Sequence, residues 1–355
     1  MKQIEHFVGG KIIPGKSNKK GKVFNPATGE QEKEVRLASK ADLDHTVNIA
    51  QEAFKEWSLK PSLVRARIMF KFKELIEKNS DELTQLIVSE HGKVYEDAKG
   101  SLTRGLEVVE FACGIPHLLK GEFSENVGTN VDSWSMRQPL GVVAGITPFN
   151  FPAMVPMWMF PIAIACGNTF ILKPSEKDPS ISIKLAQLFQ EAGLPDGVLN
   201  VVPGFGEDAG QALGRHMDVD CLVFTGSTAV GKLFQKYAGE SNMKQVWLET
   251  GGKSPNIIFP DADLEKAADM AAFGIFFNQG EVCSANSRLL VHSSIKDEMV
   301  GKLRERAEKI KQGDPLDPAT TMGAMVDVNH AKKVEGFLNV GKVEAKLIIG
   351  GDRFS

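Results

Sequence analysis

The chain has 355 residues, of which 42% are hydrophobic, enough to bury a sizeable core and to form two or more domains. Its 42 basic and 45 acidic residues nearly balance, which argues against the basic surface that a nucleic-acid partner requires. The first 22 residues lack the apolar segment of a secretory signal, and the four cysteines are widely scattered without a C-x-x-C pair. We therefore expect a cytoplasmic protein with no disulfide framework and no metal site.

Amphipathic patterns predict helices over residues 40–57, 62–92 and 95–119. The more polar stretch 121–137 contains Gly and Asn and is interpreted as an excursion or a hairpin. Residues 138–172 contain no charged side chain and are long enough on paper for a membrane span. Four prolines interrupt this stretch, so we interpret it as the buried centre of a domain and expect no membrane partner.

Residues 141–172 have the pattern of a β-α-β unit. The apolar run 141–147 predicts a strand, Pro152 suits the first turn of a helix that ends near Gly167, and 169–172 predict the next strand. The alternation then repeats, with predicted helices at 184–193, 207–216 and 229–239 and predicted strands at 198–202 and 221–225. The predicted fold class is α/β, with a doubly wound parallel sheet.

A second predicted unit follows Glu249. It contains a helix from about 263 to 276, a strand over 288–292, and a helix that opens at Ser294 with Asp297 completing a capping box.

Two glycine-rich loops resemble phosphate-binding motifs only in part. Residues 204–210 have one residue too many before the last glycine of a dinucleotide fingerprint, which favours an ordinary strand-to-helix turn. Residues 226–233 match a P-loop except at Leu233, which replaces the magnesium-binding hydroxyl. The N–H groups near Ser227 suit either a pyrophosphate or a simple helix cap, and spacing alone does not separate the two.

Two polar groups in glycine-flanked loops have the chemistry of covalent catalysis at a carbonyl. Cys283 lies among polar residues, which suits an accessible nucleophile, although many lone cysteines are small buried hydrophobic residues. Glu249 follows the apolar run 246–248, a neighbourhood that suits a general base, although a capping or ion-paired glutamate fits equally well.

Three further residues come at the ends of predicted parallel strands, where ligands bind in α/β folds. The amide of Asn150 is able to stabilise an oxyanion without carrying charge. Lys173 and Glu176 are placed to contact ribose hydroxyls, and a carboxylate there favours a free 2′-hydroxyl, hence NAD over NADP.

Together these segments resemble the aldehyde dehydrogenase superfamily over essentially the whole chain. The motifs that carry the resemblance, in chain order, are Thr147-Pro148-Phe149-Asn150-Phe151-Pro152, Lys173-Pro174-Ser175-Glu176, Phe224-Thr225-Gly226-Ser227-Thr228, Leu248-Glu249-Thr250-Gly251-Gly252-Lys253 and Asn278-Gln279-Gly280-Glu281-Val282-Cys283.

The resemblance implies a role for each matching residue. Cys283 would be the nucleophile, Glu249 the general base and Asn150 the oxyanion donor, in the oxidation of an aldehyde to the acid through a thiohemiacetal and a thioester. The residues implied to contact NAD are Ile146, Thr147, Pro148, Phe149, Lys173, Glu176, Gly226 and Ser227. The implied domains are an NAD-binding Rossmann-like domain (1–120 and 138–248), an oligomerisation hairpin (121–137) and an incomplete catalytic domain (249–355).

The resemblance is mixed at the subfamily level. Residues 1 to about 200 resemble methylmalonate-semialdehyde dehydrogenases, which release acyl-CoA, and the later part resembles hydrolytic aminoaldehyde-type enzymes. Arg104 matches one of two substrate-gripping arginines, but Val282 stands in place of the other. Because the acyl-CoA formers lack a glutamate at the place of Glu249, we expect hydrolysis, with the CoA-acylating reaction as the alternative.

Family members are longer than this chain and form homodimers or homotetramers. The expected partner is a small-molecule aldehyde. An inactive fragment remains the rival hypothesis, because part of the family's substrate funnel and subunit contact would lie beyond Ser355.

Overall fold

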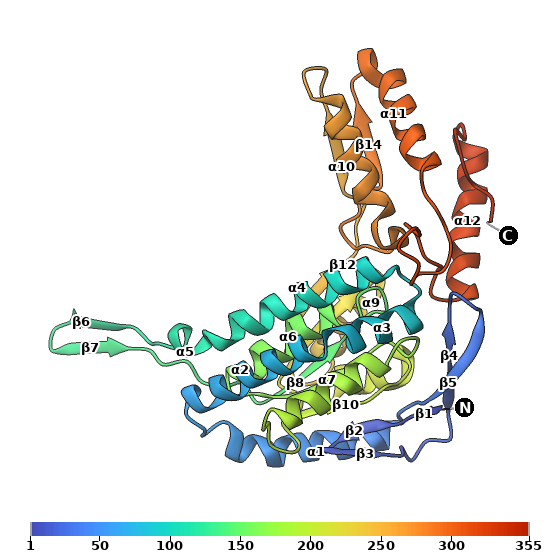
Figure 1. Ribbon diagram of the computed structural model, residues 1–355. Coiled ribbons are helices and arrows are strands. Elements are labelled where there is room, and N and C mark those ends of the chain that lie inside the picture. The colour runs from blue at the N-terminus through green and yellow to red at the C-terminus, as the bar shows by residue number, and fades with distance from the viewer. Residues whose placement is uncertain (1, 354–355) are drawn as a thin grey trace. The chain divides into compact units, whose positions relative to one another are not determined.

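The computed structural model describes residues 2–353, which divide into two compact units (Figure 1). The first unit consists of residues 1–23, 33–86 and 99–249, and the second of residues 24–32, 87–98 and 250–355, as far as they are described. The sequence led us to assign 24–32 and 87–98 to the NAD-binding domain. They belong to the second unit instead, because their packing partners lie far away in the sequence.

A seven-stranded sheet forms the centre of the first unit. Its strand order is β12 (Gln245–Thr250), β11 (Cys221–Gly226), β8 (Val142–Ile146), β9 (Thr169–Lys173), β10 (Leu199–Val201), β2 (His6–Val8) and β3 (Lys11–Ile13). Strands β11, β8, β9 and β10 are mutually parallel, whereas β2 is antiparallel to both of its neighbours. Strands β8 and β9 are buried along their whole length, as expected for a parallel sheet covered on both faces.

Helices cover both faces of this sheet, so the predicted doubly wound α/β fold is confirmed. Helices α1 (Lys40–Trp57), α8 (Gln211–Arg215) and α9 (Thr228–Gly239) pack on one side, where Val142, Ala144 and Ile146 join the core. Helices α2 (Ser62–Lys78), α6 (Met154–Ala165) and α7 (Ser180–Glu191) pack together beside an aromatic cluster. That cluster consists of Phe72, Phe160, Phe170 and Phe189.

Several helix boundaries differ from the predicted ones. The stretch 62–92 forms two helices, α2 and α3 (Ser80–His91), because Asn79 leaves the helical conformation and donates its side-chain amide to Leu75 O at 2.7 Å. The stretch 95–119 likewise divides into α4 (Tyr95–Cys113) and α5 (Ile115–Leu118), with a proline at the start of α5. The predicted helix 207–216 is a π-helical turn, η1 (Gly206–Gly210), followed by α8.

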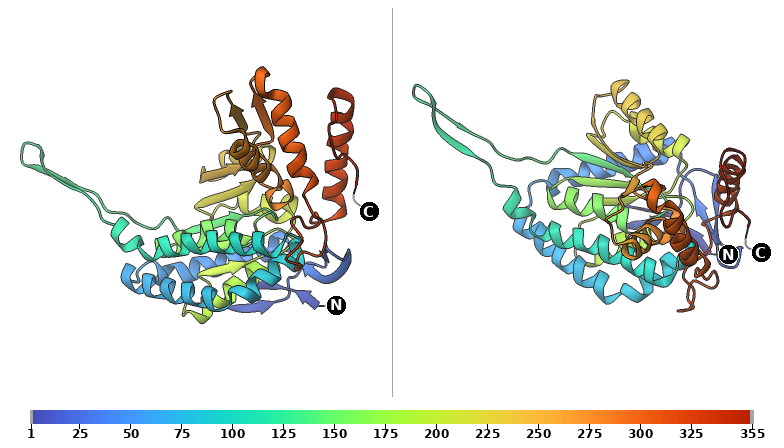
Figure 2. Two further views of the ribbon diagram at one scale, coloured as in Figure 1. Left: turned by 45° about the horizontal axis from the view of Figure 1, so that its top comes forward. Right: turned by 90° about the horizontal axis from the view of Figure 1, so that it is seen from above.

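Residues 121–137 form the hairpin that the sequence suggested. Strands β6 (Phe123–Gly128) and β7 (Val131–Trp134) are antiparallel, and every residue in them is exposed. In Figure 2 the hairpin extends well away from the helices that precede it. The sequence did not reveal β1 (Lys2–Ile4), β4 (Lys20–Asn25) and β5 (Glu30–Arg36), which form a separate three-stranded sheet.

The second unit is built on β13 (Pro255–Ile258) and β14 (Arg288–Val291), which are parallel. Helices α10 (Leu264–Phe276) and α11 (Lys296–Glu308) cover one face through Ile258, Ala268 and Met299, and α12 (Val328–Glu344) follows. The predicted capping box at Asp297 is absent. A 3-10 turn, η3 (Ser293–Ile295), precedes α11, and the His292 ring caps it by accepting from Ser294 N.

Candidate active site

The carboxyl ends of three parallel strands place most of the predicted cofactor residues at one edge of the first unit. Ile146 at the end of β8 pairs with Lys173 at the end of β9 and with Phe224 near the end of β11. Beyond β8 the chain continues through Thr147, whose N–H donates to Lys173 O at 3.1 Å. Residues 147–150, 173–176 and 226–227 therefore leave the sheet at the same edge, which is where α/β folds bind nucleotides.

The loop after β8 carries Asn150 and Phe149. Asn150 is half-buried, and Phe151 beside it is buried in the core. The Lys177 ammonium lies over the Phe149 ring, 4.8 Å from its centroid, a cation–π arrangement. Pro152 precedes α6, which begins at Met154, so the expectation that this proline occupies the first helical turn is wrong by about two residues.

Lys173 is a buried cation that binds backbone carbonyls. Its Nζ donates to Pro174 O at 2.8 Å and to Gly204 O at 2.7 Å, and it lies 3.8 Å from Glu176 Oε2. Burial lowers the pKa of the Lys173 ammonium, and the Glu176 carboxylate opposes that shift. The two carbonyls accept from two of the three donors of the ammonium, and the Glu176 carboxylate interacts with it as well.

The loop after β11 leads into a capped helix. Ser227 is the N-cap of α9, and its Oγ accepts from Val230 N at 3.3 Å. A side chain at Gly226 would meet the Phe224 ring at 2.4 Å, which explains the glycine there. The helix-cap interpretation of Ser227 is thus confirmed, and the positive end of the α9 dipole still suits an anion.

Glu249 lies on β12 in a different setting from the one expected. Its side chain is exposed on the same strand face as Trp247, whereas Val246 and Leu248 alternate to the other face and pack on the core. The carboxylate therefore lies in an exposed setting, because Val246 and Leu248 point away from it. Of the predicted apolar wall, only Trp247 lies on the same face of the strand.

Arg104 lies on α4 as a surface residue. Its guanidinium is 3.3 Å from the Glu107 carboxylate, and the arginine side chain is 70% exposed. An exposed ion pair of this kind contributes little stability, so the guanidinium can exchange its partner for a carboxylate ligand.

Cys283 belongs to the second unit and is exposed, whereas Cys113 and Cys221 are buried and Cys166 is half-buried. It follows a 3-10 turn, η2 (Phe277–Gly280), in which Asn278, Gln279 and Gly280 all have positive φ. The sequence pattern singled out Cys283 itself but not the residues that hold this turn, namely His91, Asp97, Ala324 and His330. No local signal reveals them, because they lie far from the turn in the sequence.

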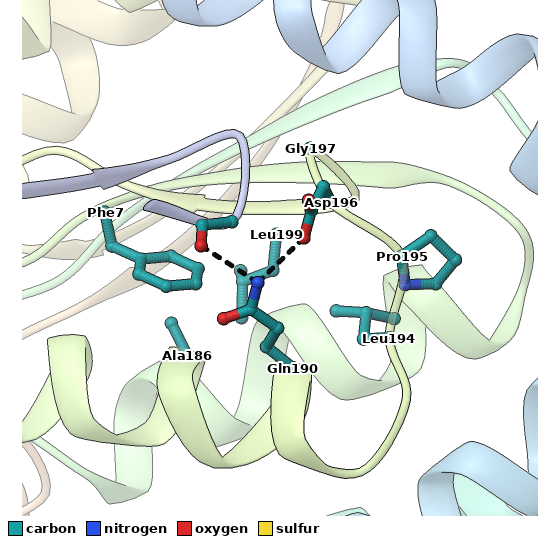
Figure 3. A pocket seen from close by; sticks show the side chains of 9 residues that line it. Phe7, Ala186, Gln190, Leu194, Pro195, Asp196, Gly197 and Leu199 are labelled. Carbon is teal, nitrogen blue, oxygen red and sulfur yellow. Dashed lines mark hydrogen bonds between the residues drawn. The ribbon is translucent and has the colours of Figure 1, made fainter. Parts of the chain in front are cut away.

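A small pocket elsewhere in the first unit is unrelated to the predicted site. Figure 3 shows Gln190 on α7, whose Nε2 donates to Gly10 O at 2.9 Å and to Asp196 Oδ1 at 2.7 Å. None of the predicted site residues lines it. Within residues 2–353 there is no grouping of three or more His, Cys, Asp or Glu side chains suited to a metal ion. No helix in that same range is long and apolar enough to span a membrane.

Comparison with known proteins supplies the family. A model of the aldehyde dehydrogenase family matches residues 12–355. The chain belongs to the aldehyde dehydrogenase family. Malonate-semialdehyde dehydrogenase 3 of Geobacillus kaustophilus is 44% identical over 99% of this chain and 72% of the relative. The resemblance inferred from the motifs is thus confirmed, as is the expectation that family members are longer.

Solved structures agree with this assignment. A methylmalonate-semialdehyde dehydrogenase from Oceanimonas doudoroffii superposes with a TM-score of 0.95 at 45% identity, over 99% of this chain and 71% of that one. An NAD⁺ complex of an aldehyde dehydrogenase from Bacillus cereus has a TM-score of 0.96 at 36% identity, over 100% of this chain and 72% of that one. The expected cofactor, NAD, is thus one that a structural relative binds.

Proposed function

We propose that this aldehyde dehydrogenase chain catalyses the NAD-dependent oxidation of an aldehyde to the carboxylic acid through a thioester on Cys283. The observation that carries the proposal is the exposed Cys283 thiol, in a chain whose other three thiols are buried or half-buried. A nucleophile must reach its substrate, and among the four cysteines only this one has an exposed side chain.

The carboxyl edge of the sheet suits NAD. Lys173 ends β9 beside Glu176, whose carboxylate is 31% exposed and able to accept from a ribose hydroxyl. The first turn of α9, opened by Ser227, offers N–H groups and a helix dipole to a pyrophosphate. When bound there, NAD would supply the acceptor for a hydride from the substrate.

The residues of the chain then perform the remaining steps. The Cys283 thiolate adds to the aldehyde carbon, and the Asn150 side-chain amide donates a hydrogen bond to the oxyanion. Loss of hydride from the same carbon converts the adduct into a thioester. Glu249 removes a proton from water, which attacks the thioester, and the thiolate leaves with release of the carboxylic acid.

The proposed substrate class is a short aldehyde that carries a carboxylate. The relatives named malonate- and methylmalonate-semialdehyde dehydrogenases support it. So does Arg104, whose exposed guanidinium is free to exchange Glu107 for a substrate carboxylate. Val282 replaces the second arginine of the acyl-CoA-forming relatives, so we expect a weaker requirement for the acid group.

The proposed acyl acceptor is water, because Glu249 is present and its carboxylate is exposed to solvent. The second candidate is coenzyme A, the acceptor implied by the resemblance of residues 1 to about 200 to methylmalonate-semialdehyde dehydrogenases, a name that one structural relative carries. Assays of NADH formation with malonate semialdehyde, with and without coenzyme A, separate the two. NADH formation that requires coenzyme A, with release of acyl-CoA in place of the free acid, would overturn the hydrolytic proposal.

Substitutions test the proposed roles. Cys283→Ala should abolish NADH formation, and undiminished turnover would refute the thioester route. Glu249→Gln should form about one NADH per site in a burst and then stall, because hydride transfer precedes hydrolysis. Steady turnover of Glu249→Gln at the original rate would remove Glu249 from the mechanism.

We further propose a cytoplasmic location, because free cysteines such as those of this chain persist in a reducing compartment. We also propose that the hairpin 121–137 is a subunit contact. Phe123, Val131 and Trp134 are each more than half exposed on it, which is costly for a surface that never meets a partner. Light scattering should show a smaller assembly for Trp134→Asp than for the unchanged chain, and equal masses would contradict the proposal.

A further inference from the structure

The turn that leads to Cys283 has an unfavourable backbone. Asn278, Gln279 and Gly280 have successive φ values of 52°, 56° and 77°. Glycine adopts this region freely and asparagine tolerates it, but glutamine does not. A non-glycine residue in this region is strained and persists only when its surroundings hold it.

Residues of the second unit that are distant from this turn in the sequence hold it in place. Asn278 N–H donates to Asp97 Oδ2 at 3.1 Å, and Gln279 Nε2 donates to Ala324 O at 2.8 Å. Within the turn, Asn278 Nδ2 donates to Glu281 O at 3.2 Å and Glu281 N–H donates to Asn278 O at 2.9 Å. The backbone is thus fixed on both sides of Gly280.

Glu281 adds a charged anchor two residues before the nucleophile. Its side chain is 4% exposed and lies between two imidazoles. His91 Nε2, at the end of α3, is 3.2 Å from Oε2, and His330 Nε2, in the first turn of α12, is 3.2 Å from Oε1. A buried carboxylate requires such partners, because an uncompensated charge in the interior is costly.

His330 is itself held in place. Asp327, the N-cap of α12, accepts from His330 N–H at 2.8 Å. The His91 side chain is completely buried, and that of His330 is 22% exposed. The carboxylate of Glu281 therefore ties the turn to the ends of two different helices.

We infer that Glu281 is a positioning residue for the nucleophile: its carboxylate, held by His91 and His330, fixes the turn that presents Cys283 to the reacting carbonyl. This inference rests on the proposed function, since it assigns Glu281 a role in that reaction. The carboxylate acts through the backbone of the turn and does not touch substrate. A displacement of about 1 Å at a nucleophile is enough to lower turnover by about 100-fold.

The kinetic test compares Glu281→Ala with Met299→Ala, a core substitution in the same unit that is remote in sequence from the turn. Glu281→Ala should lower kcat about 10- to 100-fold and leave KM for aldehyde and for NAD within about twofold. Met299→Ala should lower the thermal midpoint without changing kcat. Equal kcat losses in the two variants at matched stability would overturn the inference, since the effect would then be general destabilisation.

Rescue separates positioning from a loss of folding. Glu281→Gln keeps an acceptor and a donor at the same place and should retain most of the turnover lost in Glu281→Ala. His330→Ala, a milder change at a partly exposed side chain, should lower kcat in the same direction, and His330→Gln should restore part of it. A Glu281→Gln variant as impaired as Glu281→Ala, or a His330→Ala variant with full kcat, contradicts the inference.

Hydrogen exchange provides a readout that does not require turnover. The amides of residues 278–283 should exchange faster in Glu281→Ala than in the unchanged chain, while those of α10 and α11 stay protected. If the unchanged chain has no dehydrogenase activity, the proposed function fails, and exchange at the turn alone decides the role of Glu281. Unaltered exchange in Glu281→Ala would overturn that role.

Discussion

Selective alkylation tests the central residue of the site. Burial raises the pKa of the Cys113 and Cys221 thiols to about 11, so that at pH 8 about one molecule in a thousand carries either thiolate. Cys166 is half-buried, and burial raises the pKa of its thiol as well, with Arg65 opposing. Cys283 alone among them is exposed.

We therefore expect iodoacetamide at pH 8 to label Cys283 at least about tenfold faster than any of the other thiols. Peptide mass spectrometry over a time course would give the four rates from one sample. Cys283→Ser should remove the fast phase, and Cys166→Ser, the matched control, should leave it intact. Labelling of Cys113 or Cys221 as fast as Cys283 would refute the reasoning, because the burial that protects them would then be wrong.

Three further predictions concern stability and cofactor choice. Burial lowers the pKa of His6 to about 4. As the pH drops from 6.5 towards 4, His6 therefore becomes protonated in the unfolded chain before it does in the folded chain, and the free energy of unfolding falls. Urea unfolding should give a free energy of unfolding about 2 kcal/mol lower at pH 5 than at pH 7, and His6→Gln should remove this difference. The same pH dependence in His6→Gln would contradict the prediction. A methyl group at Gly145 would lie 2.4 Å from the Phe170 ring, so Gly145→Ala should cost about 1–3 kcal/mol, whereas Gly239→Ala, with open space around it, should cost less. Glu176→Gln should improve kcat/KM for NADP relative to NAD by about tenfold, because a carboxylate repels the 2′-phosphate; an unaltered ratio would exclude Glu176 from cofactor selection.

Local patterns predicted the centre of the fold well. The apolar runs at 141–147 and 169–172 became β8 and β9, and the amphipathic stretch 40–57 is α1 residue for residue. Continuous apolar runs report burial on both faces of a strand, and a helical period reports burial on one side, so both can be seen in the chain itself. The short strands β1, β4 and β5 escaped notice because they are rich in exposed, charged residues.

The candidate site was likewise predicted only in part from the sequence. Motif order was enough to mark Cys283, Asn150 and Lys173 and to indicate the family. It was misleading for Glu249, because alternation along β12 turns Val246 and Leu248 to the face opposite the carboxylate. Side-chain direction in a strand depends on which face the sheet buries, and that follows from packing.

The sequence by itself determined the α/β fold class, the chemical groups and their order along the chain, since each depends on neighbouring residues. Only the tertiary structure decided how the nucleophile is held. It showed that the turn before Cys283 has a strained backbone and that His91 and His330 meet on Glu281. Contacts between residues so far apart in the chain arise from the packing of separate elements, which leaves no periodic trace in the sequence.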